Sequence, residues 1–209
     1  MNEHFSKLPK EKQLKIINAG MEYFGKYGYK KAVTDDIAAR AGISKGLLFH
    51  YFDNKKNFYL FLYDFSEKLM MKYINMDDIK NIDDFFELIN YGAEKKLLLI
   101  SHYPYILNFI LKAYYLHKED VSSELNQRIK KTIDNVFDIY FRYIDFNKFK
   151  DDIDPRQVYH MLLWMGDGYL MDKQRMGKDF DVDEMLKEFK EWERMFKMMC
   201  YKEEYLWML

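Results

Sequence analysis

The residues best suited to chemistry lie between positions 34 and 55, and the chemistry they indicate is binding rather than catalysis. No acid interrupts residues 37–52, whereas two cations, an imidazole and two hydroxyls occur there. Such groups bind phosphates and the edges of bases. The predicted contacts to double-stranded DNA are Thr34, Ser44, Lys45, Gly46, Leu47, Phe49, His50, Tyr51 and Lys55.

Motifs for other chemistry are missing from the sequence. It contains no nucleophile elbow, phosphate-binding loop, dinucleotide fingerprint or zinc-ligand spacing. We therefore expect no enzyme activity, no catalytic residue, no metal and no cofactor. The single Cys200, the polar N-terminus and the lack of a long apolar run favour a cytoplasmic protein without membrane contact.

The charge is distributed unevenly along the chain. Residues 1–55 carry ten Lys and Arg against six Asp and Glu, although the whole chain has a net charge of −1. A basic head on an acidic body suggests that only the head meets a polyanion. The alternative interpretation of this charge is a solvated basic face.

Two short helices joined by a glycine turn are predicted within residues 34–52. Thr34 is expected to cap the first helix, Gly42 to end it in a left-handed conformation, and Ser44 to cap the second. The small Ala38 and Ala41 allow the two helices to cross closely. This is the minimal helix-turn-helix, and its alternative is a helical hairpin that serves only packing.

The second of these helices has two faces. Ile43, Leu48 and Phe52 are expected to point inward. Its outer face then presents the residues predicted to enter the major groove, where the start of a recognition helix meets base edges. That face comprises Lys45, Gly46, Leu47, Phe49, His50 and Tyr51.

The whole chain is predicted to be all-α, with about nine helices. Three prolines and nine glycines are few breakers for 209 residues. The expected architecture is a three-helix DNA-binding head at 1–54 and a larger helical ligand-binding and dimerisation bundle at 55–209. Polar breaks beyond the head fall near residues 75–84, 102–104, 118–123, 145–154 and 177–183.

The head resembles the DNA-binding domain of the TetR family of repressors. The resemblance covers roughly residues 9–62 and rests on a set of positions. Leu47 and Asn57 depart from the commonest residues of the family, and Phe49 matches it as an aromatic residue but replaces the common Tyr. No operator sequence is therefore transferred. The matching positions are Phe24, Gly28, Thr34, Ile37, Ala38, Ala41, Gly42, Ile43, Ser44, Gly46, Phe49, Tyr51, Phe52 and Lys55.

The resemblance implies a variable helical body that binds an inducer and dimerises through its last two long helices. The helix expected at 155–173 is apolar on two sides, which suits contact with both a core and a second subunit. Predicted dimer-interface residues are Trp164, Gly168, Met171, Phe189, Trp192 and Phe196. Aromatic and Met side chains suit an adaptable pocket, and each also fits a plain core. Predicted ligand-binding residues are Tyr103, Phe109, Tyr114, Phe137, Met161, Trp164 and Met165.

The leading hypothesis is a homodimeric, ligand-responsive regulator that acts as a repressor. It would bind a palindromic double-stranded DNA operator and be released by a small apolar or aromatic effector. The alternative is a helical protein-interaction module whose helix-turn-helix is vestigial.

Overall fold

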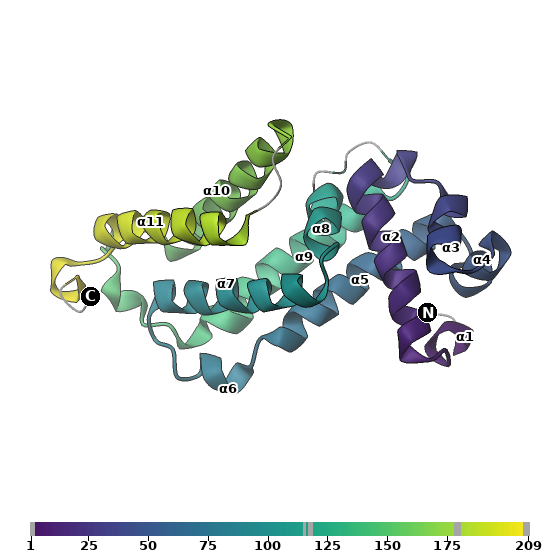
Figure 1. The fold of residues 1–209 in the computed structure, drawn as a ribbon. Coiled ribbons are helices and arrows are strands. Elements are labelled where there is room, and N and C mark those ends of the chain that lie inside the picture. The colour runs from purple at the N-terminus through teal and green to yellow at the C-terminus, as the bar shows by residue number, and fades with distance from the viewer. Residues whose placement is uncertain (1–2, 115, 117–118, 178–180, 207–209) are drawn as a thin grey trace. The chain divides into compact units, whose positions relative to one another are not determined.

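The computed structural model describes residues 3–114, 116, 119–177 and 181–206 (Figure 1). These residues form eleven α-helices and no β-strand, apart from an isolated bridge between Phe149 and Tyr201. Nine helices have eight residues or more, and two have four residues: α1 (Glu3–Ser6) and α6 (Met76–Ile79). The all-α prediction is therefore confirmed, and the two short helices are what it missed.

The nine longer helices follow the predicted order. The polar segments expected to break the chain beyond the head do separate consecutive long helices, as far as those segments are described. The bounds are α2 (Lys10–Lys31), α3 (Thr34–Ala41), α4 (Lys45–Phe52), α5 (Lys55–Tyr73), α7 (Phe85–His102), α8 (Ile106–Tyr114), α9 (Ser122–Tyr140), α10 (Pro155–Arg175) and α11 (Val182–Cys200).

The contacts divide the chain into two compact units. Unit 1 runs to Ile74 and includes Glu94–Asn135, and unit 2 comprises Asn75–Ala93 and the chain from Val136 onward. These two units are defined by how the helices pack. The predicted domains are functional instead: a DNA-binding part at 1–54 and a ligand-binding and dimerisation part at 55–209. That functional division stays a prediction.

The core of unit 1 is aromatic. Phe24 of α2 packs edge-on against Tyr59 of α5, with the ring centroids 4.9 Å apart. Phe109 of α8 contacts the same tyrosine, with the centroids 5.1 Å apart. Gly25 permits this close approach, since a Cβ there would lie 3.0 Å from the Phe109 backbone nitrogen. Helix α2 thus packs directly on α8 as well as on α3 and α5.

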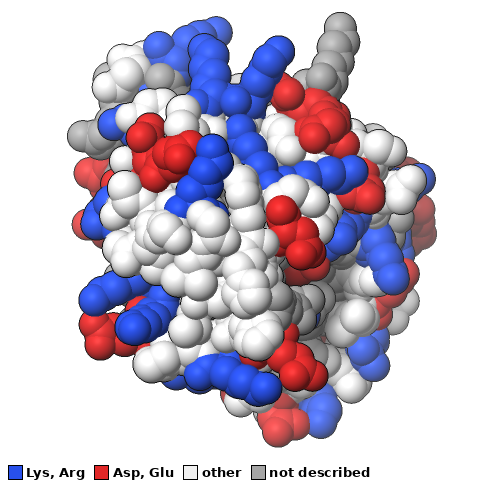
Figure 2. All heavy atoms as spheres, turned by 90° about the vertical axis from the view of Figure 1, so that its right-hand side faces the viewer, with Lys and Arg blue, Asp and Glu red and all other residues white. Residues whose placement is uncertain are grey.

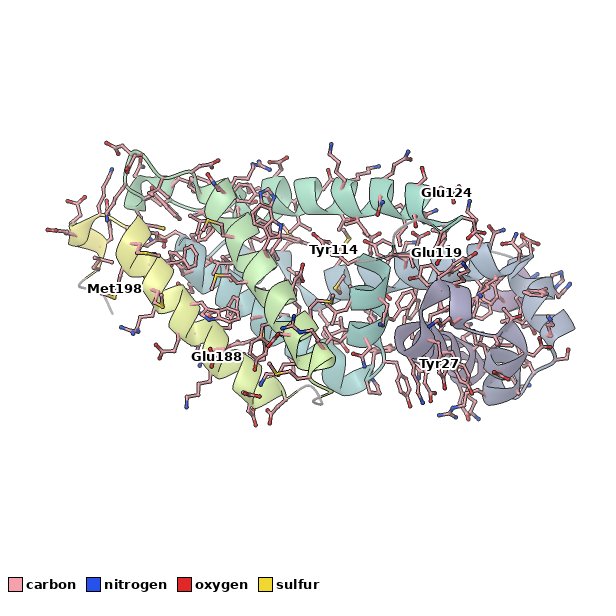
Figure 3. All side chains as sticks on the ribbon, turned by 90° about the horizontal axis from the view of Figure 1, so that it is seen from above. Tyr27, Tyr114, Glu119, Glu124, Glu188 and Met198 are labelled. Atoms are coloured by element: carbon pink, nitrogen blue, oxygen red, sulfur yellow. The ribbon has the colours of Figure 1, made fainter. Side chains whose placement is uncertain are left out.

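Helix α5 is joined to α9 by polar contacts spaced along both helices in unit 1. Lys56 Nζ lies 3.1 Å from the Glu124 carboxylate. Further along, Arg128 pairs with Asp64, and Thr132 donates a hydrogen bond to Glu67. Figure 3 labels Glu124 at the start of α9. Because α5 follows the recognition helix directly, these contacts tie the helix that leaves the head to α9.

Unit 2 has a separate aromatic core. Phe85 lies 5.0 Å from Phe141 and 5.1 Å from Phe149, measured between ring centroids. The fully buried Tyr201 accepts a 3.2 Å hydrogen bond from the Phe85 backbone N–H through its hydroxyl. The start of α7 is therefore fixed against the segment that follows α11.

Among the described helices, none is long and apolar enough to cross a membrane.

Candidate nucleic-acid interface

The turn between α3 and α4 forms as the sequence predicts. Gly42 adopts φ 71° and ψ 32°, and its N–H donates to the Ala39 carbonyl at 3.0 Å. The Ile43 N–H donates to the Ala38 carbonyl at 3.0 Å. These two bonds make a Schellman motif, which needs a residue tolerant of positive φ at the glycine position. Ser44 then caps α4, its hydroxyl accepting a 3.1 Å bond from the Leu47 N–H.

The inner face of the recognition helix α4 is confirmed. Leu48 and Phe52 are buried, and Ile43 is half-buried against the same core. Ile37 and Ala38 of α3 are also buried in this core. The crossing of α3 and α4 is therefore fixed by apolar packing, which presents a single outer face of α4.

Most of the predicted outer face is exposed. Lys45, Gly46 and His50 are exposed, Leu47 is 37% exposed, and Phe49 is half-buried. Figure 2 views the side on which α3 and α4 lie, where an uncharged area is bordered by Lys and Arg side chains and also by Asp and Glu side chains. A cation, a bare backbone, an aliphatic side chain and an imidazole thus share one surface, which suits contact with DNA.

Two predicted contact residues lie elsewhere than expected. Tyr51 is only 7% exposed, because its ring packs against Phe5 and Phe52, so its expected place on the outer face is wrong. Thr34 is 9% exposed and is the first residue of α3 rather than its cap. Val33 occupies the cap position, and no side chain there makes a capping bond. DNA contact by Thr34 or Tyr51 remains a prediction.

The two predicted lysine contacts already have intramolecular partners. Lys45 Nζ lies 2.8 Å from the Asp35 carboxylate. Lys55 Nζ donates to the Lys30 carbonyl at 3.2 Å and lies 5.0 Å from the centre of the Tyr29 ring. Burial lowers the pKa of Lys55, and the charge of Asp120 opposes that shift. Lys45 is the more available cation, because an exposed ion pair is worth at most about 1 kcal/mol.

The head contains one element that the sequence analysis did not anticipate. Helix α1 buries Phe5, which is 1% exposed, beside the recognition helix. The signal was an isolated aromatic residue in an otherwise polar N-terminal stretch. Local periodicity cannot detect it, because a four-residue helix is too short to show a stripe.

The predicted ligand-binding residues fall in both units. In unit 1, Phe109 is fully buried between Phe24 and Tyr59, whereas Tyr103 and Tyr114 are half-buried. Figure 3 labels Tyr114 at the end of α8. In unit 2, Phe137 is buried and stacks on Phe141 with the ring centroids 4.6 Å apart. Phe109 and Phe137 therefore serve as core residues, and a ligand-binding role for any of the four remains a prediction.

The other three predicted ligand residues lie on α10. Trp164 is 60% exposed and stacks on His160, Met161 is exposed, and Met165 is half-buried. An exposed residue of this kind fits an intermolecular contact as well as a pocket wall. No described group of three His, Cys, Asp or Glu side chains is placed to hold a metal ion.

The predicted dimer-interface residues lie on α10 and α11, where several apolar side chains are exposed. Gly168 and Met171 are exposed, as is Trp164. Phe189 and Trp192 are half-buried and lie edge-on to each other, whereas Phe196 is buried within its own chain. Three methionines of α11 add to the exposed apolar surface: Met195, Met198 and Met199. Figure 3 shows Met198 on the outer side of α11.

Comparison with known proteins identifies the head. Residues 16–60 match the sequence profile described as "Bacterial regulatory proteins, tetR family". That segment contains α3, α4 and the Schellman turn between them. This part of the chain is therefore similar to the DNA-binding domain of TetR-family proteins. The resemblance inferred from the sequence is thereby confirmed.

Two curated transcriptional regulators are similar to part of the chain. The transcriptional activator FasR of Mycolicibacterium smegmatis is 25% identical over 142 residues, which is 68% of this chain. The transcriptional regulator QacR of Staphylococcus aureus is 29% identical over 126 residues, which is 57% of this chain. Each alignment covers 64% of the relative's own length.

Solved structures of bacterial regulators share the fold over most of the chain. The fatty acid degradation regulator FadR of Bacillus halodurans has a TM-score of 0.68 at 16% identity, covering 86% of this chain and 96% of that one. FadR of Bacillus subtilis, solved with stearoyl-CoA, has a TM-score of 0.58 at 18% identity, covering 86% and 96%. At this identity the likeness establishes the helical fold alone.

Proposed function

We propose that this protein is a ligand-responsive transcriptional repressor of the TetR family in the cytoplasm. It binds a palindromic DNA operator as a homodimer, and a small effector releases it. The observation that carries the proposal is the outer face of α4, where Lys45, Gly46, Leu47 and His50 are exposed together. Lys45 and His50 donate to phosphates or base edges, and Leu47 offers an apolar contact to a thymine methyl group.

The contacts of α5 support a route from effector to DNA. An effector shifts an equilibrium only if it binds one conformation better than another. Helix α5 begins three residues after α4 ends and is held to α9 by the Lys56–Glu124 and Asp64–Arg128 pairs. A displacement of α9 on ligand entry would therefore move α5 and the recognition helix with it.

The relatives suggest which effector to test first. FadR of Bacillus subtilis was solved with stearoyl-CoA, and a structural neighbour from Clostridium perfringens is described as a putative fatty acid metabolism regulator. An acyl chain is apolar and flexible, and the half-buried Tyr103 and Tyr114 of unit 1 are suited to contact it. Long-chain acyl-CoA is accordingly the first effector class to assay.

Binding to the DNA upstream of the protein's own gene tests the proposal. We expect sequence-dependent binding that weakens steeply between 50 and 200 mM salt, because phosphate neutralisation releases counterions. Replacing Lys45 and Leu47 together with alanine should lower affinity about tenfold or more and reduce the salt slope by about one. Both side chains are exposed, so circular dichroism should show an unchanged fold.

Met71→Ala is the matched control, because it truncates an exposed apolar residue of α5. It should bind DNA like the wild type. DNA binding that ignores salt, or a Lys45/Leu47 variant that binds with wild-type affinity, would favour the protein-interaction module instead.

Dimerisation through α10 and α11 predicts a strong effect at Trp164. This side chain is 60% exposed in the single chain, and burying an indole contributes heavily to interface free energies. Trp164→Glu should convert the dimer to a monomer in analytical ultracentrifugation, since it would place an unpaired charge in an apolar contact. Tyr27→Glu changes an exposed aromatic residue of α2 in the same way and should leave the dimer intact. Equal behaviour of the two variants would refute this interface.

A further inference from the structure

Helix α1 is attached to the recognition helix by a buried aromatic anchor. The Phe5 ring lies 4.9 Å from the Phe52 ring and 5.8 Å from the Tyr51 ring, measured between centroids. It also contacts Phe61 of α5 at 5.3 Å. With 1% of its surface exposed, Phe5 belongs to the core of the head, although it precedes the helix-turn-helix by a whole helix.

The backbone around this anchor is fixed as well. The Ser6 hydroxyl donates to the Glu3 carbonyl at 2.9 Å, and the Leu8 N–H donates to the Phe5 carbonyl at 3.2 Å. From α2, the Gln13 side-chain amide donates to the carbonyls of Leu8 at 2.8 Å and Ser6 at 3.2 Å. The segment at 3–8, which we call the N-terminal arm, therefore holds a defined position beside α4.

The N-terminal arm places His4 on the predicted DNA-facing surface. The His4 and His50 rings lie 4.9 Å apart between centroids, tilted by 41°, and both residues are exposed. His50 belongs to the last turn of α4. Residues at the start of a recognition helix meet base edges, so groups beside its last turn are placed to meet the DNA backbone.

We propose that the N-terminal arm is part of the DNA interface, with the His4 imidazole N–H donating a hydrogen bond to a backbone phosphate at the edge of each half-site. This inference rests on the proposed function. Imidazole carries an N–H donor in both of its protonation states, so the contact does not require a charged ring. The buried Phe5 restricts the motion of His4 before binding, which reduces the entropy lost on contact.

Substitutions at His4 test the proposal on the full-length protein and the operator fragment. His4→Ala should weaken binding three- to tenfold for every half-site sequence, because a phosphate contact carries no base information. His4→Glu should weaken binding more than tenfold through repulsion of the phosphate, and His4→Lys should retain wild-type affinity. Gln127→Glu adds a charge at an exposed position of α9 and should bind like the wild type.

Two further measurements separate direct contact from an indirect effect. Ethylation interference should show one phosphate per half-site that matters for the wild type and not for His4→Ala. The loss caused by His4→Ala should persist in a His50→Ala background, since each imidazole makes its own contact.

The outcomes distinguish this inference from the proposed function. If the wild type binds the operator and both His4→Ala and His4→Glu bind equally well, the arm is structural only and the inference fails alone. A His4→Ala loss that disappears in the His50→Ala background assigns the contact to His50 and also refutes it. If the wild type binds no DNA, the proposed function and this inference fail together.

Discussion

Gly20→Val is expected to destabilise the protein by about 3 kcal/mol. Gly20 lies in the middle of α2, where an added Cβ would sit 2.6 Å from both Leu62 Cδ1 and Phe58 Cζ of α5. Both neighbours are fully buried, and the Phe58 ring also lies 4.5 Å from Phe52. Overpacking a filled core costs about 1–3 kcal/mol for small additions, and valine adds three carbon atoms. Folded proteins typically have a free energy of unfolding of about 5–15 kcal/mol, so this loss would remove a large part of the stability.

Gly92→Val provides the matched control for this prediction. Gly92 lies inside α7, and a Cβ there would meet nothing within 4 Å. Its helix-propensity effect is the same as at Gly20, so the difference between the two variants isolates the packing of α2 on α5. Urea unfolding followed by circular dichroism measures both free energies. Equal stability of the two variants would contradict the close approach of these helices.

The sequence predicted the helix-turn-helix in detail because its determinants are local. Gly42 supplies the positive φ of the turn. Ser44 caps α4 by accepting a hydrogen bond from the N–H of Leu47, three residues further along the chain. These preferences act within four or five residues, so a single sequence is enough to predict them. By contrast, nothing in the sequence distinguishes Gly20 from Gly92, because the difference depends on which side chains of another helix lie opposite.

The positions whose surroundings the sequence could not reveal are those decided by distant contacts. Tyr51 has the spacing of an outer-face residue, but Phe5 approaches from the N-terminus and covers it. Lys55 resembles a free cation, but the Lys30 carbonyl holds its ammonium group. The ligand-binding residues could not be separated from the core for a related reason. Phe109 and Phe137 are residues of a type that lines ligand pockets, yet the rings of neighbouring residues pack directly against each of them.

Glu193→Gln is expected to stabilise the protein by about 3 kcal/mol at pH 8 and to change it little at pH 4.5. Glu193 of α11 is buried and accepts a 2.7 Å hydrogen bond from the Asn90 side-chain amide of α7. Burial raises the pKa of Glu193 from 4.5 to about 7, against the bond from Asn90 and the charge of Lys197, whereas Asp84 raises it further. Each unit of difference between folded and unfolded pKa corresponds to about 1.4 kcal/mol.

The sign of the pH dependence follows from which state binds the proton more tightly. The folded pKa of Glu193 is raised, so the proton bound in the folded state favours folding. That advantage is complete below pH 4.5 and is lost as the pH rises through 7, where the folded chain must hold a desolvated carboxylate. Glutamine can still accept the Asn90 bond through its amide oxygen and carries no charge.

The test is urea unfolding of the wild type, Glu193→Gln and Glu188→Gln at pH 4.5 and pH 8. Glu188 is an exposed residue of α11, so its substitution makes the same chemical change on the same helix without removing a buried charge (Figure 3). The difference in unfolding free energy between Glu193→Gln and the wild type should grow with pH, whereas Glu188→Gln should follow the wild type. A Glu193→Gln variant that is less stable at pH 8 would show that the ionised carboxylate stabilises the contact between α7 and α11. The pKa of Glu193 would then have to lie below its ordinary value, which is the opposite of what its burial implies.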